Sequence, residues 1–191
     1  MRKLLLLLPL FLLLAACRKP AVPKERGYFR IDLEQPVYTD CQLDGYPYHF
    51  LINQAATPQA VEYDGEQYWI DIFYPAFNAF VHCSYKPVKG NLRQLSDDAQ
   101  EFVFNHAVKA TAIPEHEYSN PEAHTYGILY ELEGNTASPT QFYLTDSVRH
   151  FFRGAVYVNC IPNQDSLAPV YDYLHQDVLM LIETLRWTDY E

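Results

Sequence analysis

Metal-capable side chains gather at one place in the sequence, shortly after Pro114. A catalytic metal needs ligands that helices or strands hold rigidly. Here the side chains stand in a polar stretch with an Asn-Pro pair, and this pattern predicts a loop over residues 114–125. We therefore interpret the cluster as a solvated loop and predict no metal site. Its members are Glu115, His116, Glu117, Glu122 and His124.

Three other histidines stand in apolar surroundings. His106 lies on the apolar stripe of a predicted helix with no acidic residue four positions away, and His82 and His150 lie in or beside predicted strands. We interpret all three as hydrogen-bonded core residues rather than general bases. The sequence has no GxSxG, no HExxH and no glycine-rich phosphate loop, and it holds only 7 glycines. It predicts no catalytic residue and no cofactor.

Arg153 is on the polar side of a predicted central strand, where an unpaired charge would be costly if it were covered. The pattern predicts an ion pair with Asp146 or Asp71. The alternative is a contact with an anion or with a peptide carboxylate.

The 16 tyrosines are the strongest compositional feature. A tyrosine has an apolar ring and a polar tip, so it suits core edges, protein interfaces and sugar stacking alike. We expect most of them to be half-buried in a sheet. In the alternative interpretation, four of them form an exposed binding face: Tyr46, Tyr48, Tyr63 and Tyr68.

The elements that position these residues are a sheet and two helices. Within residues 134–159, Phe142 and Leu144 alternate with polar neighbours, Asp146-Ser147 favours a reversal, and a second alternating run begins at Phe151. These are the predicted central strands. Further strands are predicted at 27–32, 48–53, 60–63, 67–74, 79–85 and 126–133, and a loop at 34–47.

The first helix is predicted from an N-cap at Ser96 to Pro114, and the second from a cap at Asp165 or Ser166 to Leu185. Consecutive strands have no long crossovers between them. The sequence therefore predicts an α+β fold, an antiparallel sheet covered by two helices, in one globular domain over residues 27–191.

The N-terminus predicts the compartment. Residues 1–16 join Arg2 and Lys3 to an apolar run and small residues, which is typical of a secretory signal. The following Leu14-Ala15-Ala16-Cys17 resembles a bacterial lipobox, which implies acyl chains, palmitate among them, on Cys17. Removal of the signal leaves 175 of the 191 residues, and residues 17–26 are the predicted lipidated cysteine and tether.

Charge limits the partners. Loss of the two basic signal residues changes the formal net charge from −10 to −12. Such a chain repels phosphates, so we predict no nucleic-acid partner and attachment to the membrane through lipid alone. No acidic cluster follows Cys17, which favours a periplasm-facing orientation, at the outer rather than the inner membrane.

Three cysteines remain beside Cys17, and an oxidising compartment permits one disulfide among them. Cys83 lies in an apolar strand pattern and is expected to be a buried hydrophobe. Cys41 and Cys160, which both flank turn-rich sequence, are the favoured pair.

Taken together, motifs from Gly27 to Trp187 resemble the GldD family of gliding-motility lipoproteins of Bacteroidetes. The departures are Thr136, where a small apolar residue is expected, and the three cysteines. The motifs that carry the resemblance are GYFRID at 27–32, NL at 91–92, the helix with His106 and Lys109-Ala110, GILYELEGN at 127–135, QFYLTDS at 141–147, HFFRGAVYVN at 150–159, PNQDSLAPV at 162–170 and ETLRW at 183–187.

The resemblance implies a non-enzymatic accessory or assembly factor of the gliding and type IX secretion machinery, whose partners are envelope proteins. The order of elements also looks like the Mog1/PsbP-like α/β sandwich, although fold alone does not define function. A second hypothesis stays open, a periplasmic lipoprotein that binds or hydrolyses glycans.

Two short segments resemble the three-residue O-glycosylation acceptor of Bacteroidetes periplasmic proteins. They are Asp146-Ser147-Val148 and Asp165-Ser166-Leu167, with Ser147 and Ser166 as the modified residues. The alternatives are a turn for the first and a helix N-cap for the second.

Overall fold

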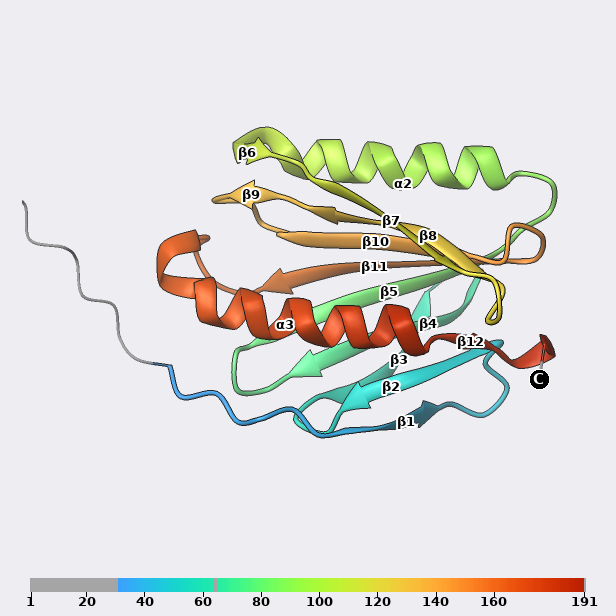
Figure 1. Ribbon diagram of the computed structural model, residues 1–191, viewed down its shortest axis with the longest axis horizontal. Helices are drawn as coiled ribbons and strands as arrows, with labels where there is room; N and C mark the ends of the chain where they lie inside the picture. Colours follow the sequence, from blue (N-terminus) through green and yellow to red (C-terminus); the bar gives the residue numbers. More distant parts are fainter. Residues whose placement is uncertain (1–30, 64, 191) are drawn as a thin grey trace, which may run out of the picture.

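The computed structural model describes residues 31–63 and 65–190 (Figure 1). The predicted signal, Cys17, the tether and most of the predicted strand at 27–32 lie outside these residues. Within them the elements are β1 (Tyr38–Gln42), β2 (Tyr48–Asn53), β3 (Thr57–Tyr63), β4 (Glu66–Tyr74), β5 (Ala79–Pro87), α2 (Leu92–His106), η1 (Ala107–Lys109), β6 (Ala110–Ala112), β7 (Glu115–Asn120), β8 (Thr125–Glu131), β9 (Glu133–Gly134), β10 (Thr140–Thr145), β11 (His150–Val158), α3 (Gln164–Thr184), β12 (Arg186–Trp187) and η2 (Thr188–Tyr190).

The centre of the molecule is a seven-stranded sheet in the order β3-β4-β5-β11-β10-β8-β7. Every neighbouring pair is antiparallel, and β11 pairs with β5 over its whole length, from His150 opposite Pro87 to Val158 opposite Ala79. The predicted central strands are therefore confirmed. Two small sheets accompany it, β1-β2-β12 and β6-β9.

One face of the large sheet is closed by α3 and by the β1-β2-β12 sheet. In Figure 1, α3 crosses in front of β5 and β11, with β1 and β2 beside it. Alternate residues of the central strands, such as Phe142, Phe152 and Val156, pack on Leu174 and Leu181 of α3, and all five are at most 3% exposed. The apolar side of α3 thus packs directly on this face of the sheet.

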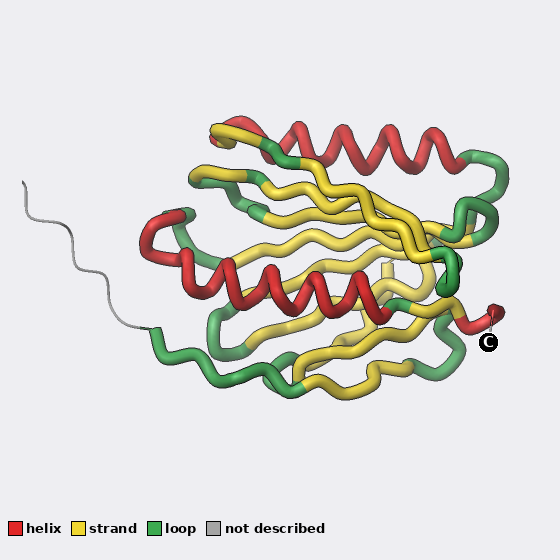
Figure 2. Tube along the Cα trace, in the orientation of Figure 1, coloured by secondary structure: helices red, strands yellow, loops and turns green. Residues whose placement is uncertain are grey.

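The opposite face of the sheet carries α2. Val103 of this helix, 1% exposed, packs against Tyr130 of β8, Leu132 and the half-buried Tyr143 of β10. This packing covers only the half of the sheet around β8 and β10, and the side chains of β4 and β5 on this face remain partly accessible. The prediction of an antiparallel sheet covered by two helices is confirmed, with α3 and α2 packed on opposite faces. Figure 2 shows strands of the sheet lying between the two helices.

Two predicted loops are strands. β1 falls within residues 34–47, and β7 falls within residues 114–125. Both lie at the edge of their sheets and expose most of their residues, so they have no alternation of apolar and polar positions that would have revealed them. Ile31 and Asp32, the described end of the strand predicted at 27–32, belong to no strand.

Both helix starts also differ from prediction. α2 begins at Leu92 after Asn91, and Ser96 is an interior residue that interacts with Tyr143. α3 is capped by Asn163, whose side chain accepts a hydrogen bond from the Ser166 amide at 3.2 Å, rather than by Asp165 or Ser166. Within residues 31–63 and 65–190, neither helix has both the length and the apolar character needed to cross a bilayer.

Candidate functional site

A pocket of about 550 Å³ lies between α2 and the uncovered half of the large sheet. We call it the α2 pocket. Its floor and walls come from β3, β4, β5, β11 and one side of α2. Ligand sites in proteins are typically concavities of about 300–1,000 Å³ with apolar walls and a few convergent polar groups. This pocket has that character.

Arg153 forms the centre of the α2 pocket. Alternation along β11 turns it toward α2, where its guanidinium lies 4.5 Å from the centre of the Phe102 ring and donates a hydrogen bond to Gln141 Oε1 at 3.0 Å. Burial lowers the pKa of Arg153, and the neighbours that oppose this effect are Tyr157 and Cys83, not a carboxylate. The contact with Phe102 is a cation–π interaction.

The ion pair predicted for Arg153 is wrong, because both candidate carboxylates are engaged elsewhere. Asp146 accepts hydrogen bonds from the backbone amides of Val148, Arg149 and His150 at 2.7–2.9 Å, which holds the turn before β11. Asp71 lies opposite His82 in the β4–β5 register and contacts its Nδ1 at 2.6 Å.

The Asp71–His82 pair lies at the side of the α2 pocket. The His82 side chain is 46% exposed, so the prediction of a core histidine is wrong here, and its ring stacks on Phe80 at 5.3 Å. A carboxylate that orients an accessible imidazole is part of a general-base relay. In the described residues, no hydroxyl or thiol is hydrogen-bonded to His82.

The rim of the α2 pocket is aromatic. Trp69 stacks on Tyr63 with 5.3 Å between ring centres and 4° between ring planes, and Lys86 lies 5.6 Å from the Trp69 ring. Lys86 also pairs with Glu66. The charge on Lys86 is therefore already matched, unlike the charge on Arg153.

The four tyrosines considered as an exposed face do not form one. Tyr48 is 2% exposed and donates a hydrogen bond to the Tyr68 carbonyl at 2.6 Å, and Tyr46 packs edge-on against both rings. Of the four, Tyr63 alone is exposed, at 63%. Burial of the others agrees with the expectation of half-buried sheet residues.

The acidic and histidine cluster around residue 116 is divided between the edge strand β7 and the β7–β8 turn, which holds Glu122 and His124. His116 of β7 faces Glu131 of β8 at 3.4 Å, and His175 of α3 reaches the same carboxylate at 3.1 Å. In the part of the chain that the structure describes, no three His, Cys, Asp or Glu side chains are placed to share a metal ion.

A second polar cluster lies on the closed face, around His150. Its Nδ1 is 2.7 Å from the Tyr85 hydroxyl, its Nε2 is 3.0 Å from Asp189, and its ring stacks on Trp187. His150 is 5% exposed and both ring nitrogens have partners, so it is the hydrogen-bonded core histidine that the sequence predicted. The cluster joins the segment after α3 to the central strands.

His106 of α2 also has a hydrogen-bond partner at each ring nitrogen, the Phe102 carbonyl and the Tyr157 hydroxyl.

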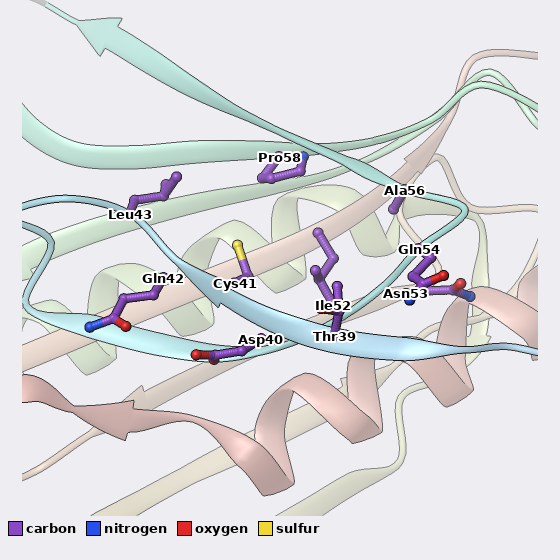
Figure 3. A pocket seen from close by; sticks show the side chains of 10 residues that line it. All are labelled: Thr39, Asp40, Cys41, Gln42, Leu43, Ile52, Asn53, Gln54, Ala56 and Pro58. Atoms are coloured by element: carbon purple, nitrogen blue, oxygen red, sulfur yellow. The ribbon is translucent and has the colours of Figure 1, made fainter.

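The cysteines do not form the favoured pair. Cys41, Cys83 and Cys160 are all free thiols. Figure 3 shows Cys41 at a hollow of about 470 Å³ between the β1–β2 hairpin and β3, with its sulfur turned toward β3 and Asp40 turned away. Burial, with a smaller contribution from Asp40, raises the pKa of the Cys41 thiol to about 11, which makes it a poor nucleophile.

The two serines considered for glycosylation occupy different settings. Ser147 is exposed in the β10–β11 turn with φ of 69°, and Ser166 is half-buried in the first turn of α3. Modification of either one stays a prediction, which the intact mass of the native protein tests.

Sequence reasoning singled out Arg153 but missed the residues that surround it, chiefly Trp69, Lys86, Phe102 and Gln141. The alternation of side chains along the strands could have predicted part of this site. One face of the neighbouring strands β4 and β5 carries Trp69, Asp71, His82, Ser84 and Lys86. The register that joins them to Arg153 could not be read from a single sequence.

Residues 18–187 match the model of the family described as "Gliding motility lipoprotein GldD". A search of the curated proteins finds no match. Among solved structures, the chain is similar to cyanobacterial PsbP (CyanoP) from Synechocystis sp. PCC 6803, with 10% sequence identity over 78% of this chain and 95% of that one. The TM-score is 0.46, and nothing about function is taken from a likeness at this level.

Proposed function

Since the chain belongs to the gliding motility lipoprotein GldD family, we propose that it is a non-enzymatic accessory or assembly factor of the gliding and type IX secretion machinery. The family match carries this proposal. The protein is held by acyl chains on Cys17 and faces the periplasm, at the outer rather than the inner membrane. Its partners are envelope proteins of the machinery.

The geometry supports binding rather than turnover. The ionisable groups of the α2 pocket are largely matched with each other, Lys86 with Glu66 and His82 with Asp71. Nucleophilic catalysis needs a nucleophile hydrogen-bonded to its base, and in the described residues His82 has no such neighbour. A tethered binding protein also needs little intrinsic affinity, because the membrane raises the effective concentration of its partner.

The first experiment separates binding from catalysis. H82N and D71N change the carboxylate–histidine pair of the α2 pocket, and both residues are partly exposed, so the variants should fold. Gliding, secretion and protein level are measured together, with R93Q on the solvent side of α2 as the control. We expect normal gliding and secretion. An H82N protein that is abundant, correctly anchored and inactive would overturn the non-enzymatic part of the proposal.

The second experiment identifies the partners. Photo-crosslinking residues are placed at Val108 and Phe104, which are 89% and 54% exposed, and at Val148 on a distant turn as a comparison. Crosslinked products are identified by mass spectrometry from intact cells. We expect gliding or secretion proteins from at least one position. Adducts confined to unrelated abundant envelope proteins at all three positions would contradict the proposal.

The anchor is tested by C17S, which removes the acylated thiol. We expect loss of acyl labelling and release of the protein from the membrane fraction, with gliding reduced to the level of a deletion strain. Density-gradient fractions of the unaltered protein then distinguish the outer from the inner membrane. Retention of label and membrane attachment in C17S would contradict the lipobox interpretation.

A glycan-binding role remains the second candidate, supported by the stacked Tyr63 and Trp69 rings beside Glu62, Glu66 and Gln67. An exposed aromatic face next to hydrogen-bonding side chains suits a sugar ring. Binding of envelope glycan fragments that is lost in Y63A, and kept in R93Q, would favour it over the assembly role.

A further inference from the structure

We propose that the α2 pocket binds a ligand with one carboxylate on an aromatic or branched aliphatic body, and that Arg153 is the residue that pairs with this carboxylate. The free C-terminus of a polypeptide that ends in an apolar residue has this chemistry, and so has a small aromatic acid. The proposal concerns a ligand of this pocket and goes beyond the role in gliding.

Arg153 is the first reason. A covered guanidinium is normally matched by a carboxylate, because an unmatched charge costs free energy away from water. In residues 31–63 and 65–190, Arg153 has no carboxylate within ion-pair distance, and its one hydrogen bond goes to the neutral amide of Gln141. The fork of guanidinium N–H groups matches the two oxygens of a carboxylate.

Gln141 is the second reason. It is 1% exposed, and because its Oε1 accepts from Arg153, its Nε2 must point another way. This nitrogen is one of two buried side-chain polar atoms in the described residues that have no hydrogen-bond partner. Buried polar groups are nearly always satisfied in native proteins. Gln141 lies beside Arg153 but does not line the pocket, so the guanidinium has one neutral acceptor and keeps further N–H donors for a ligand.

A second donor lines the pocket beside Arg153. Ser84 of β5 lies directly opposite Arg153 in the β5–β11 register and lines the same pocket. Side chains in such pairs have Cβ atoms roughly 4.5–5.5 Å apart, which brings the Ser84 hydroxyl within reach of an anion held by Arg153.

The walls indicate the rest of the ligand. Phe102 covers the guanidinium from α2 although it is itself 48% exposed, and Phe151 and Leu95 add apolar surface. The volume of about 550 Å³ has room for one large apolar side chain with its carboxylate and the preceding residue.

Charge favours a monoanion over a phosphate. Glu66 pairs with Lys86 and Asp71 is hydrogen-bonded to His82, and Asp98 of α2 adds a further negative charge to the lining. Arg153 is therefore the one unmatched cation of the lining in the described residues. A dianionic or polyanionic ligand would meet these carboxylates and have too few cations to balance it.

The test uses the purified full-length lipoprotein in detergent and follows tryptophan fluorescence, to which Trp69 of the pocket contributes, together with calorimetry. The probes are N-acetylphenylalanine and Ala-Ala-Phe, each as the free acid and as the amide. We expect the free acids to bind and amidation to weaken binding at least tenfold. Equal binding of acid and amide, or saturable binding of neither at millimolar concentration, would overturn the proposal.

Variants locate the site. R153M should lose at least tenfold in affinity for the free acids, while R93Q, which also removes one arginine but from an exposed position of α2, should bind normally. If R153M does not fold, F102A tests the same pocket, because Phe102 is partly exposed and its loss should weaken binding severalfold. Unchanged affinity in R153M, or in F102A where that variant replaces it, would place binding elsewhere and contradict the proposal.

Comparison of the peptide with the single amino-acid derivative distinguishes the source of the carboxylate. Tighter binding of Ala-Ala-Phe than of N-acetylphenylalanine indicates the terminus of a polypeptide, and equal binding indicates a small acid. Since binding is measured on the isolated protein, its outcome is independent of whether the protein serves gliding or secretion.

Discussion

The two faces of the seven-stranded sheet differ in how completely other elements cover them. The face toward α3 is closed and mostly apolar, with Phe142, Phe152 and Leu174 all at most 1% exposed. The face toward α2 is covered over β8 and β10 but carries Asp71, His82 and Arg153 beside the uncovered strands β4 and β5. Because successive side chains of a strand point to opposite faces, the same strands contribute residues to both faces. The face toward α3 therefore forms the core, and the face toward α2 holds the pocket for which we propose a ligand.

The largest expected effect tests this contrast in stability. Leu174→Ala removes a fully buried side chain of α3 and should lower the free energy of unfolding by about 2–5 kcal/mol. Phe102→Ala on the opposite face should cost less than about 1 kcal/mol, because half of that side chain is already exposed. Urea unfolding of the two variants measures the difference. Similar costs would mean that both faces serve as core.

Loss of a buried polar group should also lower stability more on the closed face than on the open face. Asp177 of α3 is 5% exposed and accepts hydrogen bonds from the Tyr38 hydroxyl at 2.7 Å and from Asn53 Nδ2 at 2.9 Å. Asp177→Ala leaves both donors without this acceptor and should cost about 1–3 kcal/mol. Asp71→Ala on the open face should change stability by at most about 1 kcal/mol. A larger loss in Asp71→Ala would contradict the contrast.

The smallest effect concerns alkaline pH. The thiol of Cys41 has its pKa raised to about 11 by burial, from an ordinary value of 9.0. The folded state favours the neutral thiol, so its contribution is fully present below pH 9 and is lost as the pH rises through 11. The unaltered protein should therefore lose more stability between pH 8 and pH 10.5 than Cys41→Ala does. Parallel losses in urea unfolding would show that the thiol is accessible to water.

The sequence predicted the closed face better than the open one, for a physical reason. Leu174 and Leu181 repeat at helical spacing and Phe142 and Leu144 alternate, because each of these residues is buried against apolar neighbours. β1 and β7 are edge strands whose residues mostly meet water, so their stabilisation comes from backbone pairing that leaves no side-chain pattern.

The composition of the α2 pocket could likewise be predicted only in part. Arg153 was recognisable as a charge on a central strand, but its assumed partners are engaged in local contacts, Asp146 with backbone amides and Asp71 with His82. Which residue lies beside Arg153 depends on the order and register of β5, β11 and β10 and on the position of α2. These are set by packing between distant segments and are not encoded in local spacing.

The pairing of β12 with β2 has a consequence for the order of folding. Arg186 and Trp187 lie opposite His49 and Tyr48, so the sheet that closes the core joins segments about 138 residues apart. Contacts of such long range form late, since the whole intervening chain must first be available. A chain that is still being exported lacks the strand that completes this sheet. For the periplasm-facing lipoprotein that we propose, the domain can therefore reach its final form only after β12 has crossed the membrane.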